Sequence, residues 1–153
     1  MKISNCCKYL LSFPKTLFLN FSVFPLSVAV KLPVWVHYNV KLVLSQKECI
    51  QISSDNISTA MIKLGFSEGS PGVFNGNNSD GHGGGYIRVQ KDSKLIFRGS
   101  ANIARGFSLL ADRGGIIDIG ENFNSNIHLF LASNKMVKIG DNCLFGWQLR
   151  WIY

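Results

Sequence analysis

Two short motifs in this chain match patterns that serve nucleophilic catalysis in serine hydrolases. Residues 65–69 read G-x-S-x-G, the pattern of a nucleophile elbow, and residues 82–85 read HGGG, the pattern of an oxyanion-stabilising loop. An elbow leads from a strand into a helix, but residues 70–72 are Ser-Pro-Gly, and HGGG should precede the serine. A serine hydrolase is therefore disfavoured, and we expect these glycines to serve turns.

The chain has three histidines, the residues best suited to general acid–base chemistry near neutral pH. His37 lies in an alternating strand pattern and is interpreted as a structural or surface residue. His82 lies in a glycine-rich loop that gives no means of fixing an imidazole, and His128 is expected to point outward. No pair of histidines, and no histidine with a cysteine, has metal-ligand spacing, so no metal site is predicted.

The four cysteines are Cys6, Cys7, Cys49 and Cys143. None belongs to a C-x-x-C pair and two are adjacent, which favours neither a zinc ribbon nor a disulfide framework. A reducing cytoplasm is the simplest setting for such a chain.

A repeat of six residues runs through residues 95–153. Phe97, Ile119 and Ile139 occupy the same place in three similar phrases that lie 22 and 20 residues apart, and short polar or glycine inserts separate the phrases. A helix does not explain this period, whereas a three-sided coil does, with one short strand and one inward apolar side chain per side. The sequence therefore predicts an all-β parallel solenoid.

The repeat predicts which side chains point inward. The first column comprises Phe97, Ile103, Leu109, Ile119, Leu131, Ile139, Phe145 and Trp151. Ser125 falls at the same six-residue spacing, between Ile119 and Leu131. A second column comprises Ala101, Phe107, Phe123, Leu129, Cys143 and Leu149, and a third comprises Leu95, Ile117 and Val137.

We expect three regions along the chain. Residues 1–33 form a basic apolar leader, residues 34–94 form irregular early coils with a Gly/Asn-rich loop, and residues 95–153 form the regular coils. The uncharged part of the leader has 15 residues, whereas a membrane-spanning helix needs roughly 20. We expect a short helix or an extended segment packed against the solenoid, broken at Pro25 and Pro33.

The net charge of +7 is concentrated near the N-terminus. Residues 1–50 contain six lysines and one acid, Glu48, which gives them a charge of +5. This region could contact an anionic membrane surface, or its lysines could simply solvate the rim of an apolar module. Nucleic acid is a poor fit, because the basic residues are scattered and the aromatic residues occupy core-like positions.

The hexapeptide unit [Leu/Ile/Val]-Gly-x-x-x-x recurs at residues 119–124 and 139–144, and more loosely at 145–150. In these units the chain resembles the hexapeptide-repeat acyltransferases, whose fold is a left-handed parallel β-helix. With its leader and residues 65–72 and 93–99, it is similar to the members that O-acetylate sugars during bacterial surface-polysaccharide synthesis. The left hand follows from the resemblance alone, because general packing physics favours right-handed crossovers.

The resemblance implies transfer of an acetyl group from acetyl-CoA to a sugar hydroxyl, without a metal. A histidine would act as general base, and backbone N–H groups would stabilise the oxyanion. The sugar would be part of a polysaccharide precursor. The full-length form would be a cytoplasmic homotrimer with active sites between neighbouring subunits, and a peripheral contact with the membrane is compatible with its basic leader.

The chain departs from the family at the catalytic residue. The family's histidine sits in an Asp-x-His phrase shortly after the segment matching residues 144–147, which places the expected histidine beyond Tyr153. Asp80-Gly81-His82 comes about three coils too early, so the role is not transferred to it. We expect an inactive N-terminal piece, with Asn142 and Trp147 at the border of the acceptor site. The alternative is a non-enzymatic β-solenoid that serves as a binding or scaffold module.

Overall fold

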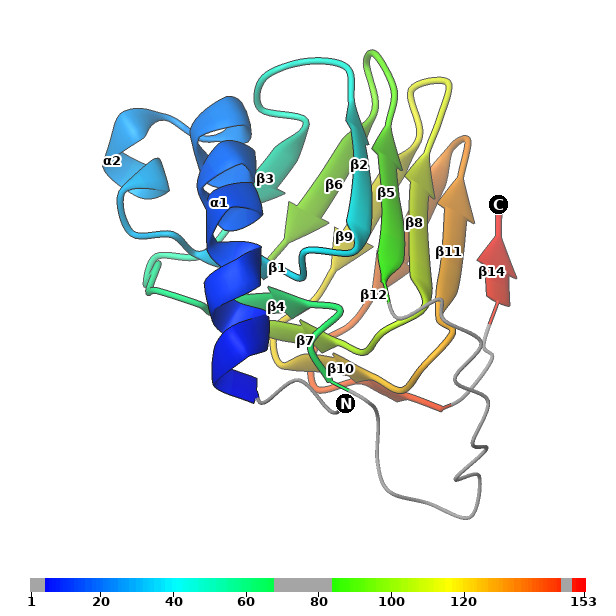
Figure 1. The fold of residues 1–153 in the computed structure, drawn as a ribbon. Coiled ribbons are helices and arrows are strands. Elements are labelled where there is room, and N and C mark those ends of the chain that lie inside the picture. The colour runs from blue at the N-terminus through cyan, green and yellow to red at the C-terminus, as the bar shows by residue number, and fades with distance from the viewer. Residues whose placement is uncertain (1–4, 68–83, 147–149) are drawn as a thin grey trace.

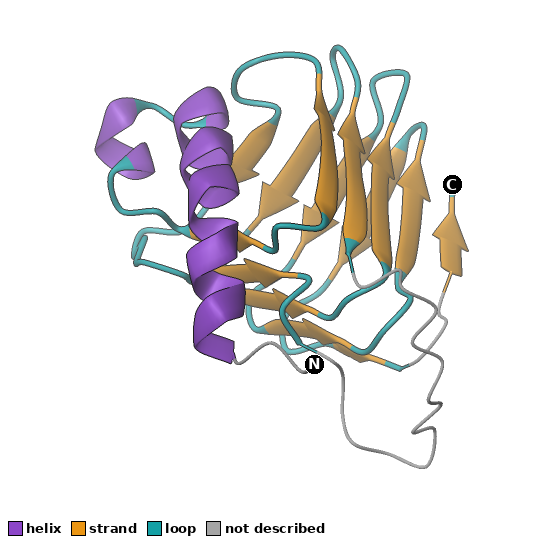
Figure 2. Ribbon diagram, in the orientation of Figure 1, coloured by secondary structure: helices purple, strands orange, loops and turns teal. Residues whose placement is uncertain are grey.

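The computed structural model describes residues 5–67, 84–146 and 150–153, and shows short strands preceded by two helices (Figures 1 and 2). The helices are α1 (Asn5–Val23) and α2 (Leu26–Ala29). The strands are β1 (Val34–Val36), β2 (Val40–Leu44), β3 (Ile50–Ile52), β4 (Ile62–Leu64), β5 (Gly85–Val89), β6 (Lys94–Phe97), β7 (Ala101–Ile103), β8 (Phe107–Ala111), β9 (Ile116–Ile119), β10 (Phe123–Ser125), β11 (Phe130–Ser133), β12 (Met136–Ile139), β13 (Leu144–Phe145) and β14 (Arg150–Ile152).

The strands form three parallel sheets, and each turn of the coil adds one strand to each sheet. Sheet A has the order β1-β4-β7-β10-β13, sheet B has β2-β5-β8-β11-β14, and sheet C has β3-β6-β9-β12. Figure 1 shows the successive coils stacked along one axis. The predicted three-sided solenoid is confirmed, and β1 to β6 belong to the same three sheets as the regular repeats.

The register of the sheets confirms the predicted inward columns. Phe97 pairs with Ile119, which pairs with Ile139, and Leu131 pairs with both Leu109 and Trp151. The inward side chains of the middle coils are almost completely buried. Burying each large apolar side chain contributes roughly 1.5–3 kcal/mol, so the stacked columns are the main source of stability.

Trp151 corrects the prediction at one end of the stack. It keeps the expected register with Leu131, but 56% of it is exposed. The reason is that β14 is the edge strand of sheet B, so within the described chain no strand covers Trp151 on its far side. Leu149, which was also predicted to point inward, lies outside the described residues.

The leader is helical, and α1 lies across the first coil as a cap. Three polar side chains on one face of α1, Ser12, Thr16 and Asn20, are completely buried. They meet the backbone of residues 34–38, which includes β1, the edge strand of sheet A. The helix begins at Asn5 and includes Pro14, so it extends further towards the N-terminus than the uncharged segment that we expected to form it.

A ladder of hydrogen bonds joins α1 to this edge. The backbone N–H groups of Val34, Val36 and Tyr38 donate to Asn20 Oδ1, Thr16 Oγ1 and Ser12 Oγ at 3.2, 3.2 and 2.9 Å. Four residues of helix advance about 6.0 Å and two residues of strand about 6.6 Å, so the two spacings match over a few residues. The polar stripe therefore satisfies backbone groups that another strand would otherwise have to pair.

Neither α1 nor α2, the helices of the described chain, combines the length and the mean hydropathy that crossing a membrane requires.

Candidate functional site

Asn142, which was expected to border an acceptor site, lies at the corner where the chain passes from sheet C to sheet A. Its backbone has a φ of 57°, and Asn122, one coil earlier, has a φ of 54°. Asparagine tolerates this left-handed conformation better than most residues. The two side chains are joined, because Asn122 Nδ2 donates to Asn142 Oδ1 at 3.0 Å.

Gly120 allows this corner to stack closely. A Cβ atom at Gly120 would lie 2.4 Å from the backbone of Gly140, one coil further on. The hexapeptide glycine is needed here for close approach of successive coils, while the positive φ falls on the asparagine two residues later. Asn142 is exposed, and its hydrogen bond with Asn122 holds its side chain in place. Trp147, the other predicted border residue, lies outside the described residues, so its proximity to Asn142 stays a prediction.

The corner between sheets A and B brings His128 above Gly106. His128 is exposed and has a φ of 62°, and Gly106, one coil earlier, has a φ of 73°. A Cβ atom at Gly106 would lie 2.8 Å from His128 Nδ1. Any residue larger than glycine at position 106 would therefore displace the imidazole of His128. The position agrees with the outward orientation predicted for this histidine.

The same corner is continuous over three coils. The backbone N–H of His128 donates to the Arg105 carbonyl at 3.2 Å, and the N–H of Arg105 donates to the Ser67 carbonyl at 2.9 Å. Ser67 follows β4, and Gly65 before it has a φ of 83°, as a turn residue would. The described part of the G-x-S-x-G phrase therefore enters this corner and not a helix.

A depression opens beside this corner on the outer face of sheet A. It has a volume of about 220 Å³ and is lined by Lys8, Tyr9, Lys63, Phe66, Ser67 and Asn102. Tyr9 and Phe66 stack with their ring centroids 4.5 Å apart and their planes 9° from parallel. Aromatic surface beside ammonium, amide and hydroxyl groups suits a ligand that combines apolar patches with hydroxyls, as a sugar does. We call these six residues the sheet-A depression.

His37 lies behind the sheet-A depression and has a structural role. It is 5% exposed, packs edge-on against Phe66, and its Nδ1 accepts the backbone N–H of Asn39 at 3.3 Å. Burial lowers the pKa of His37, and the nearby charges of Lys8 and Lys15 lower it further. A neutral, buried imidazole that accepts a bond from its own loop fits the structural interpretation of this residue. His82 lies outside the described residues.

Cys49 is not placed as a nucleophile, and the described residues form no metal site. Cys49 is completely buried, and burial raises the pKa of its thiol, which keeps it protonated and unreactive. In the described ranges no three His, Cys, Asp or Glu side chains gather closely enough to hold a metal ion.

Sequence reasoning missed the α1 side of the sheet-A depression. Lys8 and Tyr9 precede the uncharged stretch and carried no motif, while Lys63 and Asn102 stood at outward positions of strands. The register Lys63↔Asn102 shows that these two side chains come from adjacent strands of sheet A. The leader was expected to pack against the solenoid, and the spacing of Ser12, Thr16 and Asn20 is the signal that could have placed it on sheet A.

The chain matches no protein-family model, no curated protein and no solved structure. The triangular parallel β-helix is thus established by the arrangement of the chain itself.

Proposed function

We propose that this chain is the acceptor-binding scaffold of an acetyl-CoA-dependent sugar O-acetyltransferase, built on a left-handed β-helix. The observation that carries the proposal is the register of the coils. The hexapeptide units at residues 119–124 and 139–144 pair with each other through Ile119 and Ile139, and Phe97 of the preceding coil pairs with Ile119, in a three-sided parallel prism. This is the architecture that the sequence resemblance implies for hexapeptide-repeat acyltransferases.

The outer surface supports an acceptor role. The sheet-A depression offers stacked aromatic rings with ammonium, amide and hydroxyl groups, and it adjoins the corner that carries Arg105 and His128. Asn142 adds an exposed amide at the corner between sheet C and sheet A. Acetyl-CoA as donor, a homotrimer as the assembled form and a cytoplasmic location belong to the same proposal and rest on the resemblance.

We assign no catalytic residue within residues 1–153. In the family the general base follows the segment that matches residues 144–147, and Asp80-Gly81-His82 does not occupy that place. The scaffold would hold the sugar hydroxyl, while a histidine in an Asp-x-His phrase would remove its proton as the oxygen attacks the thioester carbonyl. The leaving group would be the thiolate of CoA.

The acceptor role can be tested by amide chemical shifts of the labelled chain during titration with hexoses and N-acetylhexosamines. The proposal predicts saturable shifts at Lys63, Asn102, Arg105 and His128, and their loss in Lys63→Gln and Asn102→Ala variants. Lys138→Gln on sheet C is the matched control and should bind as the unaltered chain does. Shifts that are absent from this surface for every sugar would count against the acceptor role and favour a non-enzymatic β-solenoid that acts as a scaffold.

A further inference from the structure

α1 buries a mixed face and exposes much of its apolar surface. Its buried face carries Ser12, Thr16 and Asn20 together with Leu19 and Val23, whereas Phe18 and Leu10 on the outer face are 64% and 73% exposed. A surface helix of a soluble protein normally turns its apolar stripe inward. α1 departs from this pattern because its polar stripe satisfies the backbone of residues 34–38. Leu19 and Val23 still pack into the core, but a second set of large apolar side chains faces outward.

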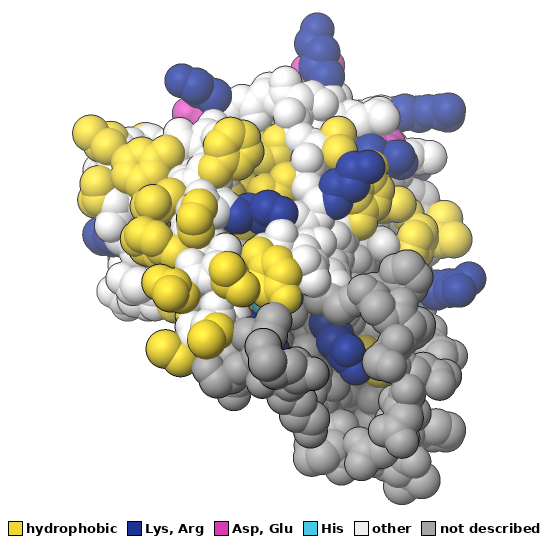
Figure 3. Space-filling model, viewed as in Figure 1, with side chains coloured by type: hydrophobic (Ala, Val, Ile, Leu, Met, Phe, Trp, Pro, Cys, Tyr) yellow, Lys and Arg dark blue, Asp and Glu magenta, His cyan; other side chains and the backbone are white. Residues whose placement is uncertain are grey.

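These outward residues form one surface with α2, which we call the outer helix face. It comprises Leu10, Leu11, Phe13, Phe18, Phe21, Leu26 and Val30, all of which are exposed. Figure 3 shows hydrophobic side chains gathered over α1 and α2, with lysine or arginine side chains at several places around them. Contiguous apolar surface of this kind on a soluble protein marks a contact with a membrane or a partner.

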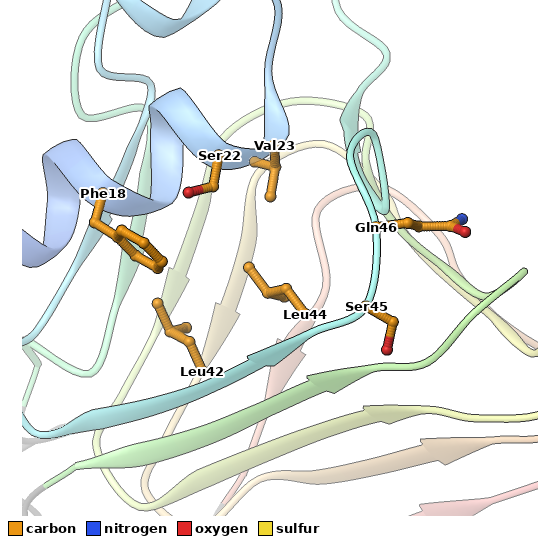
Figure 4. Close-up of a pocket in the computed structure, with 7 residues that line it drawn as sticks. All are labelled: Phe18, Ser22, Val23, Leu42, Leu44, Ser45 and Gln46. Atoms are coloured by element: carbon orange, nitrogen blue, oxygen red, sulfur yellow. The ribbon is translucent and has the colours of Figure 1, made fainter.

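Two depressions deepen the outer helix face. One, of about 320 Å³, lies between α1 and β2, where Phe18 of the helix faces Leu42 and Leu44 of the strand (Figure 4). The other, of about 280 Å³, brings Phe21 and Leu26 together with Lys47. Apolar side chains thus continue from α1 to β2, and the margin carries the ammonium group of Lys47 and the carboxylate of Glu48.

The charge around this face identifies its occupant. Lys31 follows Val30 directly, Lys41 precedes Leu42, and Lys47 lines the second depression, and all three lysines are exposed. Glu48, the first acidic residue of the chain, lines the second depression beside Lys47, so the face carries one acid against these three lysines. A second copy of the chain would bring the same positive charges against these, and like charges repel. An anionic lipid surface offers both the apolar medium and the opposite charge.

We propose that the outer helix face lies on an anionic lipid bilayer, with α1 parallel to the membrane plane. Phe18, Phe21 and Leu26 would enter the boundary between headgroups and acyl chains, and Lys31, Lys41 and Lys47 would contact lipid phosphates. This contact is independent of the acyltransferase proposal, since it uses the capping helices and not the sheet-A depression. Its failure in an experiment would leave the acceptor role untouched.

Vesicle co-sedimentation tests the contact, with phosphatidylcholine vesicles that contain or lack phosphatidylglycerol. We expect the chain to bind the anionic vesicles at least about tenfold more tightly, and added salt to weaken this binding. The Phe18→Ser/Phe21→Ser variant should lose about tenfold or more in affinity. Met136→Ser is the matched control, because Met136 and Phe21 are both 48% exposed and Met136 lies on β12, at the far edge of sheet C.

Lysine variants test the charge without altering the helix. Lys31→Gln and Lys47→Gln should each weaken binding to anionic vesicles about fivefold, while Lys138→Gln on β12 should not change it. These variants keep the test valid if the serine variant fails to fold. Equal binding to both kinds of vesicle, or equal binding by the lysine variants and the unaltered chain, would overturn the proposal. So would sedimentation showing that the chain self-associates through Phe18 and Phe21 without binding vesicles.

Discussion

Asn20 and Val34 exchange two hydrogen bonds, so one side chain of α1 pairs both backbone groups of a strand residue. The N–H of Val34 donates to Asn20 Oδ1 at 3.2 Å, and Asn20 Nδ2 donates to the Val34 carbonyl at 2.7 Å. Asn20 Nδ2 also donates to the Thr16 carbonyl within the helix. This exchange reproduces what a neighbouring strand would provide, and it occurs in a fully buried environment.

Replacing Asn20 with leucine should destabilise the fold strongly. The substitution keeps the approximate shape of the side chain but leaves the N–H and C=O of Val34 buried and unpaired. We expect a loss of about 2–4 kcal/mol in the free energy of unfolding, measured by urea denaturation. Asn56→Leu at an exposed position is the control and should change stability by less than about 0.5 kcal/mol. Equal stability of the two variants would show that the exchange does not matter.

Gly106→Ala should displace the imidazole of His128 as well as destabilise the chain. Alanine would occupy a φ of 73°, and its Cβ would press against the ring, so we expect a cost of about 1–2 kcal/mol. Gly140→Ala is the control, since a Cβ there meets nothing within 4 Å. Imidazole resonances of His128 should shift only in the first variant. If His128→Ala restores none of the lost stability in the Gly106→Ala background, the contact is not the cause.

His37 should make the fold less stable in mild acid. Its pKa is lowered in the folded state by burial and by Lys8 and Lys15, so the unfolded chain binds a proton that the folded chain excludes. Stability should therefore fall as pH decreases below the ordinary histidine pKa of about 6.5, by up to about 1.4 kcal/mol per pH unit. His37→Gln should reduce this slope in thermal or urea unfolding, whereas His128→Gln should keep it because His37 remains. An unchanged slope in His37→Gln would contradict the assignment.

Ser125 occupies an inward position that an apolar side chain would fill better. It pairs with Ile103 and Phe145, and its buried hydroxyl has no hydrogen-bond partner among the described residues. Ser125→Ala should therefore raise the free energy of unfolding by about 1–2 kcal/mol, because it removes an unpaired buried polar group. Ser108→Ala at an outward position of β8 should be close to neutral. A loss of stability in Ser125→Ala would mean that the hydroxyl is paired.

The register of the coils could be predicted from sequence because each inward position repeats through a fixed period. Phe97, Ile119 and Ile139 identify the same side of three coils, and any slip by one residue would turn apolar side chains outward. The role of α1 could not be predicted in this way. Leu19 and Val23 pack into the core, but the contacts that place the helix on sheet A join polar side chains to the backbone. Ser12, Thr16 and Asn20 read as interruptions of an apolar leader.

The sheet-A depression could not be predicted from the sequence for a related reason. Asn142, expected from the resemblance to border the acceptor site, pairs with Asn122, and its role there stays a prediction. The sheet-A depression joins Tyr9 of α1 to Phe66 after β4, and such pairing over a long sequence separation depends on how the cap docks. Trp151 was predicted inward from its period alone, which carries no information on whether another coil covers it.

The acyltransferase proposal is tested most directly on a chain extended through the DNA that follows the codon for Tyr153. The account predicts an Asp-x-His phrase there in one reading frame. It also predicts that the extended chain releases CoA thiol from acetyl-CoA when a sugar acceptor is present, and that replacing the new histidine with alanine abolishes the release. Residues 1–153 alone should give only background. Absence of the phrase, or thiol release by residues 1–153 that His82→Ala abolishes, would contradict it.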